Sequence, residues 1–207
     1  MAPYFLLYQL DMAIIYKMYR TLVIINMIFR TPINTSRLLL KQESLNDFER
    51  FYNMSADPEV MQYIGDGSVY HWTKEVALVK YKDAFSRQDN QELGNLAVYS
   101  LDQDAYIGWC GVGFSKYLDH IELSYRYCRD SWGNGYATEA AAAILTETYQ
   151  VTDIDNILAC THPDNTASIR VLEKLGFYFS HSKLSKPIGK NIPVYKIDRK
   201  TYAAKIK

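Results

Sequence analysis

The stretch SWGNGYATEAAAAIL, Ser131–Leu145, constrains the fold more than any other part of the chain. It follows the run HIELSYRYC, in which polar and apolar residues alternate as in a half-buried strand, and it leads into an alanine-rich helix. The first N–H groups of a helix have no partner within it, and the helix dipole adds positive potential there. Since Gly133 and Gly135 let the backbone approach a ligand closely, the stretch predicts a phosphate-binding strand, loop and helix.

Two other interpretations of this stretch compete with that one. Dinucleotide-binding folds carry a third glycine at the position of Thr138 and an acidic residue at the end of the following strand. Here Asp153 and Asp155 precede the strand NILACTH instead of ending it, which argues against a nicotinamide site. The other alternative is an ordinary glycine turn followed by alanines that allow close helix packing, and the loop alone does not exclude it.

The sequence from residue 31 onwards predicts a single α/β domain. Three strand-like runs joined by short connections predict an antiparallel meander in the middle of the chain, and helical and strand patterns alternate after it. Strands are expected at 35–42, 95–102, 106–115, 120–128, 156–162, 178–182 and 194–199. Helices are expected at 44–54 with Ser44 as N-cap, at 72–88 with Thr73 as N-cap, at 136–149 and at 165–176.

A second segment, THPDNTASIRVLEKLGF at 161–177, identifies the ligand of the loop. Together with SWGNGYATEA it resembles the GNAT superfamily of acetyl-CoA-dependent N-acetyltransferases, and Trp132 is similar to the branch of RimJ/RimL-type ribosomal-protein N-terminal acetyltransferases. The resemblance covers roughly 33–202. It implies one GNAT domain over 31–207, with a central, mostly antiparallel mixed sheet that splays open at the coenzyme A site and is flanked by helices. The implied cosubstrate is acetyl-CoA, with no metal.

The resemblance also implies which residues bind the cosubstrate. Main-chain groups near Tyr125 and Tyr127 are expected to pair with the pantetheine arm, while Asn165 and Ser168 lie along the pantetheine and beside the thioester sulfur. Asn165 is equally suited to be a helix N-cap, and the two roles can coexist. The loop of the superfamily aligns with a stretch that begins at Trp132, and the resemblance implies that the pyrophosphate is held by the N–H groups of Gly133, Asn134, Gly135, Tyr136, Ala137 and Thr138. Arg170 and Lys174 either reach coenzyme A phosphates or are solvated on a helix face.

Acetyl transfer to an amine requires a neutral amine, stabilisation of the oxyanion that forms, and a proton for the leaving thiolate. Glu122 is the candidate base, with a solvated or paired strand carboxylate as the alternative, and a backbone N–H near Tyr125 is the candidate to polarise the carbonyl. Many members of the superfamily use a tyrosine as the acid, but the matching position here is Leu172. Ser168 is therefore the candidate acid, with coenzyme A positioning as its alternative, and Tyr178 is a fallback that fits a strand better.

The charge balance and the cysteines argue against other classes of protein. Lys plus Arg number 23 and Asp plus Glu number 23, so no nucleic-acid partner is expected. The three cysteines, Cys110, Cys128 and Cys160, are odd in number and widely spaced, which predicts core thiols in a reducing cytoplasm rather than disulfides or zinc. The four histidines have no metal-ligand spacing, and the sequence contains no P-loop or Gly-x-Ser-x-Gly motif.

Residues 1–30 are apolar and aromatic and form a separate N-terminal extension. Asp11, Lys17, Arg20 and Arg30 interrupt the apolar runs before they reach the ~18–20 residues that span a bilayer, so no stable membrane insertion is expected. A secretory signal would need basic residues before the first apolar run, and none precedes it. The extension is expected to pack on the domain, to mediate self-association as a homodimer, to lie on a membrane surface, or to be an artefact of an upstream start.

The predicted function is acetyl transfer from acetyl-CoA to a primary amine, foremost a protein N-terminal α-amine, by direct attack in a ternary complex. A small-molecule amine, such as a polyamine or an antibiotic, is the alternative acceptor, because the resemblance defines the donor site better than the acceptor site. A non-catalytic acyl-CoA-binding module is the alternative from another class. The acceptor walls are expected in the first helices, the loop GDGSVYHW and the late strands, with Asp57, Glu59 and Asp66 as acidic groups.

Overall fold

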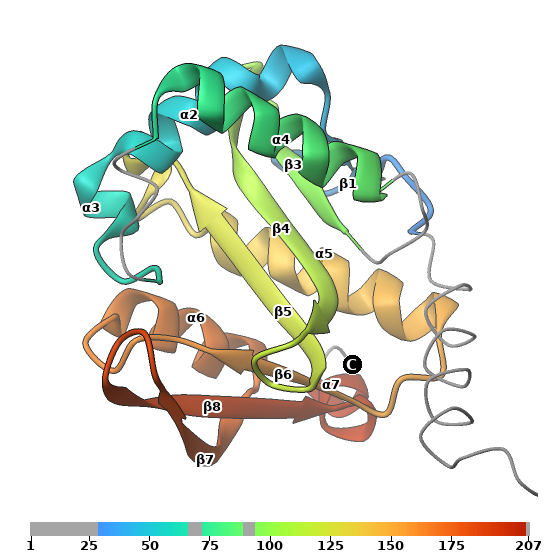
Figure 1. Cartoon of the computed structure of the whole chain (residues 1–207). Coiled ribbons are helices and arrows are strands. Elements are labelled where there is room, and N and C mark those ends of the chain that lie inside the picture. The colour runs from blue at the N-terminus through green and yellow to red at the C-terminus, as the bar shows by residue number, and fades with distance from the viewer. Residues whose placement is uncertain (1–28, 66–71, 89–93, 206–207) are drawn as a thin grey trace, which may run out of the picture.

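A mixed β-sheet organises the structure, a computed structural model that describes residues 29–65, 72–88 and 94–205 (Figure 1). Its strands are β1 (Ile33–Asn34), β2 (Leu38–Gln42), β3 (Asn95–Ser100), β4 (Ala105–Ser115), β5 (His120–Tyr127), β6 (Asn156–Cys160), β7 (Tyr178–Ser185) and β8 (Lys190–Asp198). The helices are α2 (Phe48–Ala56), α3 (Pro58–Met61), α4 (Lys74–Gln88), α5 (Tyr136–Val151), α6 (Thr166–Leu175) and α7 (Arg199–Lys205). Short 3-10 helices cover Leu45–Asp47 and Arg129–Ser131.

The strand order confirms the predicted antiparallel meander and the mixed sheet. Among the described residues the order is β1-β2-β3-β4-β5-β6-β8-β7. β3, β4 and β5 are joined by antiparallel pairing, and β5 pairs with β4 along its whole length, from Gly108 opposite Tyr127 to Ser115 opposite His120. Strands β5 and β6 are the parallel neighbours of the sheet.

The backbone pairing of β5 with β6 is confined to one residue pair. Glu122 faces Leu158, and beyond that pair the two strands diverge, as Figure 1 shows. The edge of β5 that does not face β4 is therefore left without a partner strand from about Ser124 onwards. An unpaired strand edge offers backbone N–H and C=O groups to a ligand. The predicted splay of the sheet is confirmed.

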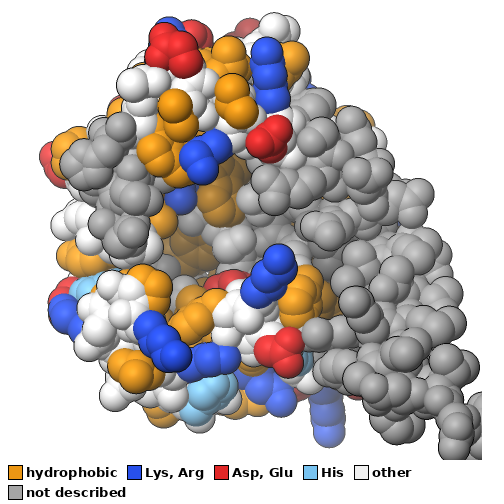
Figure 2. Space-filling view, in the orientation of Figure 1, with side chains coloured by type: hydrophobic (Ala, Val, Ile, Leu, Met, Phe, Trp, Pro, Cys, Tyr) orange, Lys and Arg blue, Asp and Glu red, His pale blue; other side chains and the backbone are white. Residues whose placement is uncertain are grey.

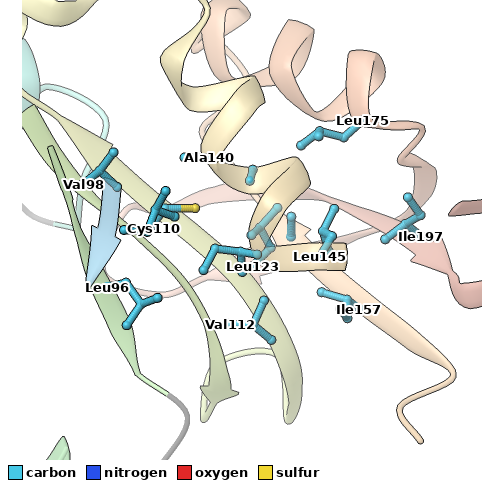
Figure 3. Close-up of a cluster of buried hydrophobic side chains, with 14 of the residues drawn as sticks. Leu96, Val98, Cys110, Val112, Leu123, Ala140, Leu145, Ile157, Leu175 and Ile197 are labelled. Atoms are coloured by element: carbon cyan, nitrogen blue, oxygen red, sulfur yellow. The ribbon is translucent and has the colours of Figure 1, made fainter. Parts of the chain in front are cut away.

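Helices cover both faces of the sheet, so the core has two layers. On one face, α5 packs against β2, β4 and β5, and its buried side chains include Ala140, Ala141, Ile144 and Leu145, all with no exposed surface (Figure 3). On the other face, α2 and α3 place Met54 and other apolar side chains against Ala97 and Tyr106. The alanines thus do allow close helix packing, and this places the N-terminus of α5 directly beside the divergence of β5 and β6.

Several element boundaries differ from the sequence expectation. The helix expected at 44–54 begins as a 3-10 turn, with Ser44 and Asp47 forming a capping box, and then continues as α2. Strands β7 and β8 extend to a hairpin in which Ser185 faces Lys190, because main-chain pairing continues through a polar, lysine-rich sequence. Helix α7 was not expected, since its large apolar side chain is Tyr202 alone and gives no periodic pattern.

The N-terminal extension lies outside the described residues up to residue 28. Phe29 is buried in the main core, and Arg30 forms an ion pair with Glu147 on α5, with Nε 2.9 Å from Oε1. The expected boundary between extension and domain at residues 30 and 31 stays a prediction. Within the described part of the chain, no helix combines the length and the apolar character needed to cross a bilayer.

Candidate active site

A cavity of about 570 Å³ opens where β5 and β6 diverge. In the space-filling view, the face of the molecule is hollowed between the part that carries α2 and α3 and the part that carries α6 (Figure 2). The walls come from α3, the second half of β5, the loop before α5, the segment after β6, and α6. All the predicted site residues except Asn134 line this cavity: Glu122, Tyr125, Tyr127, Trp132, Gly133, Gly135, Tyr136, Ala137, Thr138, Asn165 and Ser168.

The glycine loop presents free backbone donors to the cavity. Gly133 and Gly135 have φ of +81° and +79°, a region that side chains with a Cβ rarely adopt. The N–H of Glu139 bonds to the carbonyl of Gly135 at 3.1 Å and is the first to close a turn of α5. The N–H groups of the first three helix residues, 136–138, therefore have no partner within the helix. These donors, with the helix dipole behind them, suit an anion such as a pyrophosphate.

Arg37 holds the glycine loop against the start of α5, a role that the sequence reasoning did not assign. Its Nη1 donates to the carbonyl of Asn134 at 3.0 Å, and its Nη2 lies 2.6 Å from Oε2 of Glu139. Thr35 Oγ1 donates to Glu139 Oε1 at 2.6 Å. Burial raises the pKa of Glu139, but these hydrogen bonds outweigh burial and hold the pKa below its ordinary value. The carboxylate therefore remains charged at neutral pH, and the clamp that Arg37 forms between Glu139 and the loop stays in place.

Trp132 supports the loop through its side chain. Its indole Nε1 donates to the carbonyl of Tyr127 at 3.0 Å, so this carbonyl already has a partner before any pantetheine arm pairs with it. The guanidinium of Arg129 lies 4.8 Å from the indole centroid and forms an ion pair with Glu59 of α3, 2.6 Å from Nε to Oε2. The tryptophan thereby connects β5, the loop and α3.

Asn134 also acts within the loop. Its Nδ2 donates to the carbonyls of Ser131 and Trp132, both at 3.2 Å. The side chain therefore stabilises the loop from inside. Asn134 does not line the cavity, and its expected contact with the phosphates stays a prediction.

The opposite wall begins with Asn165, which is the N-cap of α6. Its side chain accepts a hydrogen bond from the N–H of Ser168 at 3.1 Å, which confirms the predicted cap. Ser168 Oγ in turn lies 3.0 Å from the hydroxyl of Tyr125, which reaches across from β5. Leu172, one turn further along α6, is almost fully buried. The hydroxyl groups of a strand tyrosine and a helix serine thus meet in the wall of the cavity.

The remaining candidates on this side have different surroundings. Arg170 and Lys174, on the exposed side of α6, line the cavity and add positive charge to its wall. Tyr178 lies on β7, is 46% exposed and does not line the cavity, so the structure separates this fallback from the other candidates.

Glu122 lies at the point where the two strands meet. The thiol of Cys160 on β6 donates to its Oε1 at 3.1 Å. Burial, reinforced by the neighbouring carboxylate, raises the pKa of Cys160, so the group stays a thiol and a donor at neutral pH. Glu122 is therefore a paired carboxylate in the wall of the cavity. The Cys160 thiol holds Oε1 and thereby fixes the orientation of Oε2.

The end of the cavity nearest α3 is aromatic and polar. The rings of Tyr63 and His162 stack with centroids 5.2 Å apart and an interplanar angle of 24°, joining the turn after α3 to the segment after β6. Glu59 lines the cavity, whereas Asp57 caps α3 by accepting from the N–H of Glu59 at 2.8 Å. Asp66 and most of the expected acceptor loop lie outside the described residues.

No group of three or more His, Cys, Asp or Glu side chains within the described ranges could hold a metal ion. The cysteines are free, with Cys110 and Cys128 buried and Cys160 partly buried. His120 lies on β5 and His181 on β7, away from His162, and His71 falls outside the described residues.

Comparisons with known proteins identify the family. A family model described as "Acetyltransferase (GNAT) domain" matches residues 37–178. The chain belongs to the GNAT acetyltransferase family. The uncharacterized N-acetyltransferase YnaD of Bacillus subtilis is 32% identical over 146 residues, which cover 70% of this chain and 81% of YnaD.

Solved structures share the fold of this GNAT domain. A GNAT-family acetyltransferase from Bacillus anthracis superposes with a TM-score of 0.68 at 24% identity, covering 84% of this chain and 99% of that one. RimL, a ribosomal L7/L12 alpha-N-protein acetyltransferase solved with coenzyme A, superposes with a TM-score of 0.68 at 13% identity, covering 80% of this chain and 97% of RimL. As a member of the family, the protein is an acetyl-CoA-dependent acetyltransferase.

Proposed function

We propose that this GNAT acetyltransferase transfers the acetyl group of acetyl-CoA to a protein N-terminal α-amine by direct attack in a ternary complex. The observation that carries the proposal is the cavity between the diverging strands β5 and β6, which has the free N–H donors of a helix N-terminus in its wall. An elongated substrate with a phosphate at one end and a thioester at the other fits a cavity of this polarity.

The donor is bound chiefly by the backbone. The pyrophosphate lies on the N–H groups from Gly133 to Thr138, and Arg170 and Lys174 contribute positive charge. The pantetheine arm pairs with the free edge of β5 near Tyr125, in the manner of an added strand, and passes Asn165. The side-chain oxygen of Asn165 is used by its cap, and its amide nitrogen faces the arm as a donor.

The chemical step uses groups at the point where the strands meet. Glu122 takes a proton from the attacking amine, and the Cys160 thiol, bonded to Oε1, orients the carboxylate. A backbone N–H near Tyr125 stabilises the oxyanion on the former carbonyl oxygen. Ser168 donates a hydrogen bond to the departing sulfur. The new C–N bond replaces the C–S bond, and coenzyme A leaves as the thiol.

The acceptor reaches the thioester from the end of the cavity near α3. Two observations favour a polypeptide acceptor: Trp132 matches the RimJ/RimL pattern, and the fold is shared with RimL, a ribosomal L7/L12 alpha-N-protein acetyltransferase. The carboxylates of Glu59 and Asp164 in the cavity wall are paired with Arg129 and Lys190, so an approaching ammonium group would have to share or replace these partners.

Acceptor identification tests the proposal. The full chain is incubated with isotopically labelled acetyl-CoA and a panel of N-terminal peptides, polyamines and aminoglycosides, and the products are read by mass spectrometry. Label on the α-amine of peptides is the expected result. Label on a small amine alone would show that the acceptor is a small molecule and not a protein N-terminus. Binding of acetyl-CoA without transfer to any acceptor would identify a non-catalytic binding module. Glu122→Gln, which keeps the shape of the side chain, should abolish transfer while coenzyme A still binds.

A further inference from the structure

Two hydroxyl groups meet in the wall of the cavity. Tyr125 extends from β5 and Ser168 from α6, and their oxygens lie 3.0 Å apart although 43 residues separate them in the sequence. Both residues line the cavity, at the place where the sulfur of coenzyme A lies in the proposed function. The Tyr125 oxygen is also 3.4 Å from the backbone carbonyl of Ser168.

The direction of this hydrogen bond decides what Ser168 can do. A serine hydroxyl has a single hydrogen, so Ser168 cannot donate both to Tyr125 and to sulfur. If Tyr125 donates, the serine hydrogen is released toward the cavity. Of the two Ser168 acceptors within reach of the Tyr125 hydrogen, Oγ is the nearer, at 3.0 Å against 3.4 Å for the backbone carbonyl. Burial raises the pKa of Tyr125, so its hydroxyl keeps the hydrogen that it donates throughout the neutral range.

We propose that Tyr125 is a positioning residue whose hydroxyl donates to Ser168 Oγ and thereby turns the Ser168 hydrogen toward the sulfur of coenzyme A. This inference rests on the proposed function, since it concerns the same thioester. The amine adds to the carbonyl carbon and the C=O electron pair moves to oxygen; when the C=O bond re-forms, the C–S bond breaks and its electron pair moves to sulfur, which accepts the Ser168 hydrogen bond. The proton given up by the amine balances the proton that the thiol finally gains, so no further reactant is needed.

The first test measures the acidity of the thiol of bound coenzyme A and needs no acceptor. The ultraviolet absorbance of the thiolate is titrated against pH for the full chain and for Ser168→Ala, Tyr125→Phe and the double variant. A hydrogen bond to a charged group contributes about 1.5 kcal/mol or more, so Ser168→Ala should lower the acid dissociation constant of the bound thiol about tenfold. Tyr125→Phe should lower it several-fold, and the double variant should equal Ser168→Ala.

The second test measures turnover. Both single variants should lower kcat, by about a hundredfold for Ser168→Ala and about tenfold for Tyr125→Phe, with the KM for acetyl-CoA nearly unchanged. The double variant should be no slower than Ser168→Ala, because the two groups act in series. Ser168→Thr keeps a hydroxyl, so in this variant kcat should again fall when Tyr125 is replaced by Phe.

Tyr149→Phe is the matched control, since it removes a hydroxyl that bonds to the carbonyl of Ile197 at 3.3 Å, outside the cavity. It should leave kcat and thiol acidity unchanged, and its thermal unfolding gives the baseline for the loss of one buried hydroxyl. Thiol acidity that is unchanged in Tyr125→Phe, or effects on kcat that multiply in the double variant, would overturn the inference. A chain that binds coenzyme A but transfers acetyl to no acceptor would instead refute the proposed function, while the titration would still decide the role of Tyr125.

Discussion

Glu43 provides a quantitative test of how the domain responds to pH. Glu43 directly follows β2, and its carboxyl group lies beside the Asp47 carboxylate and the hydroxyl of Tyr106, which is 3.4 Å from Oε1. Burial raises the pKa of Glu43 from 4.5 to about 7, and the hydrogen bond from Tyr106 opposes only part of that effect. The folded state therefore holds the proton more tightly than the unfolded state does.

The sign follows from this linkage. The stabilisation from the protonated group is fully present below pH 4.5 and is lost as pH rises through about 7. The difference between 4.5 and 7, at about 1.4 kcal/mol per pKa unit, corresponds to about 3 kcal/mol. Because Glu43 keeps some contact with solvent, we expect Glu43→Gln to exceed the natural chain in free energy of unfolding by about 1–3 kcal/mol at pH 8.

The assay is urea unfolding, followed by tryptophan fluorescence, at pH values about one unit apart, roughly pH 5, 6, 7 and 8, which lie on both sides of the titration of Glu43. The advantage of Glu43→Gln should be small at pH 5 and should grow steadily toward pH 8. Glu49→Gln, on the outer face of α2 where the side chain is 61% exposed, is the matched control and should differ little from the natural chain at every pH. An advantage of Glu43→Gln that is equal at pH 5 and pH 8 would refute the reasoning.

Three further changes test the loop and its support. Gly135→Glu places a side chain at a φ of +79° and adds a carboxylate where the proposed function places the pyrophosphate, so coenzyme A affinity measured by calorimetry should fall about a hundredfold or more. Gly189→Glu, at a φ of +69° in a turn with open space around it, should bind coenzyme A normally. Arg37→Ala removes the clamp on the loop and should raise the KM for acetyl-CoA about tenfold. Arg30→Ala, which removes an ion pair at the other end of α5, should leave this KM unchanged. Equal effects of the two variants would show that a general weakening of α5 is responsible. Ala140→Leu overfills the contact between α5 and the sheet and should lower the free energy of unfolding by about 1–3 kcal/mol. A change within error of zero in denaturant unfolding would contradict this prediction.

Local pattern was enough to predict most of the elements and the donor loop. Periodicity within one strand or one helix identified the meander from β3 to β5 and the helices α4, α5 and α6, because both depend on residues only a few positions apart. The glycines before α5 and the Asn165 cap are likewise local, since a positive φ or a cap involves three or four neighbouring residues. The sequence by itself therefore determined the family, the order of the elements and the position of the glycine loop before α5.

The tertiary structure alone decided which side chains meet. Arg37 reaches the loop around Asn134 from 97 residues away, and Tyr125 contacts Ser168 only because β5 and β6 are neighbours that diverge with α6 closing the gap. Neither contact has a signature in the sequence, since Arg37 and Tyr125 sit in ordinary strand patterns. The burial of Glu43 follows in the same way from packing, because hydrophobic periodicity describes apolar side chains and cannot report where a carboxyl group is desolvated.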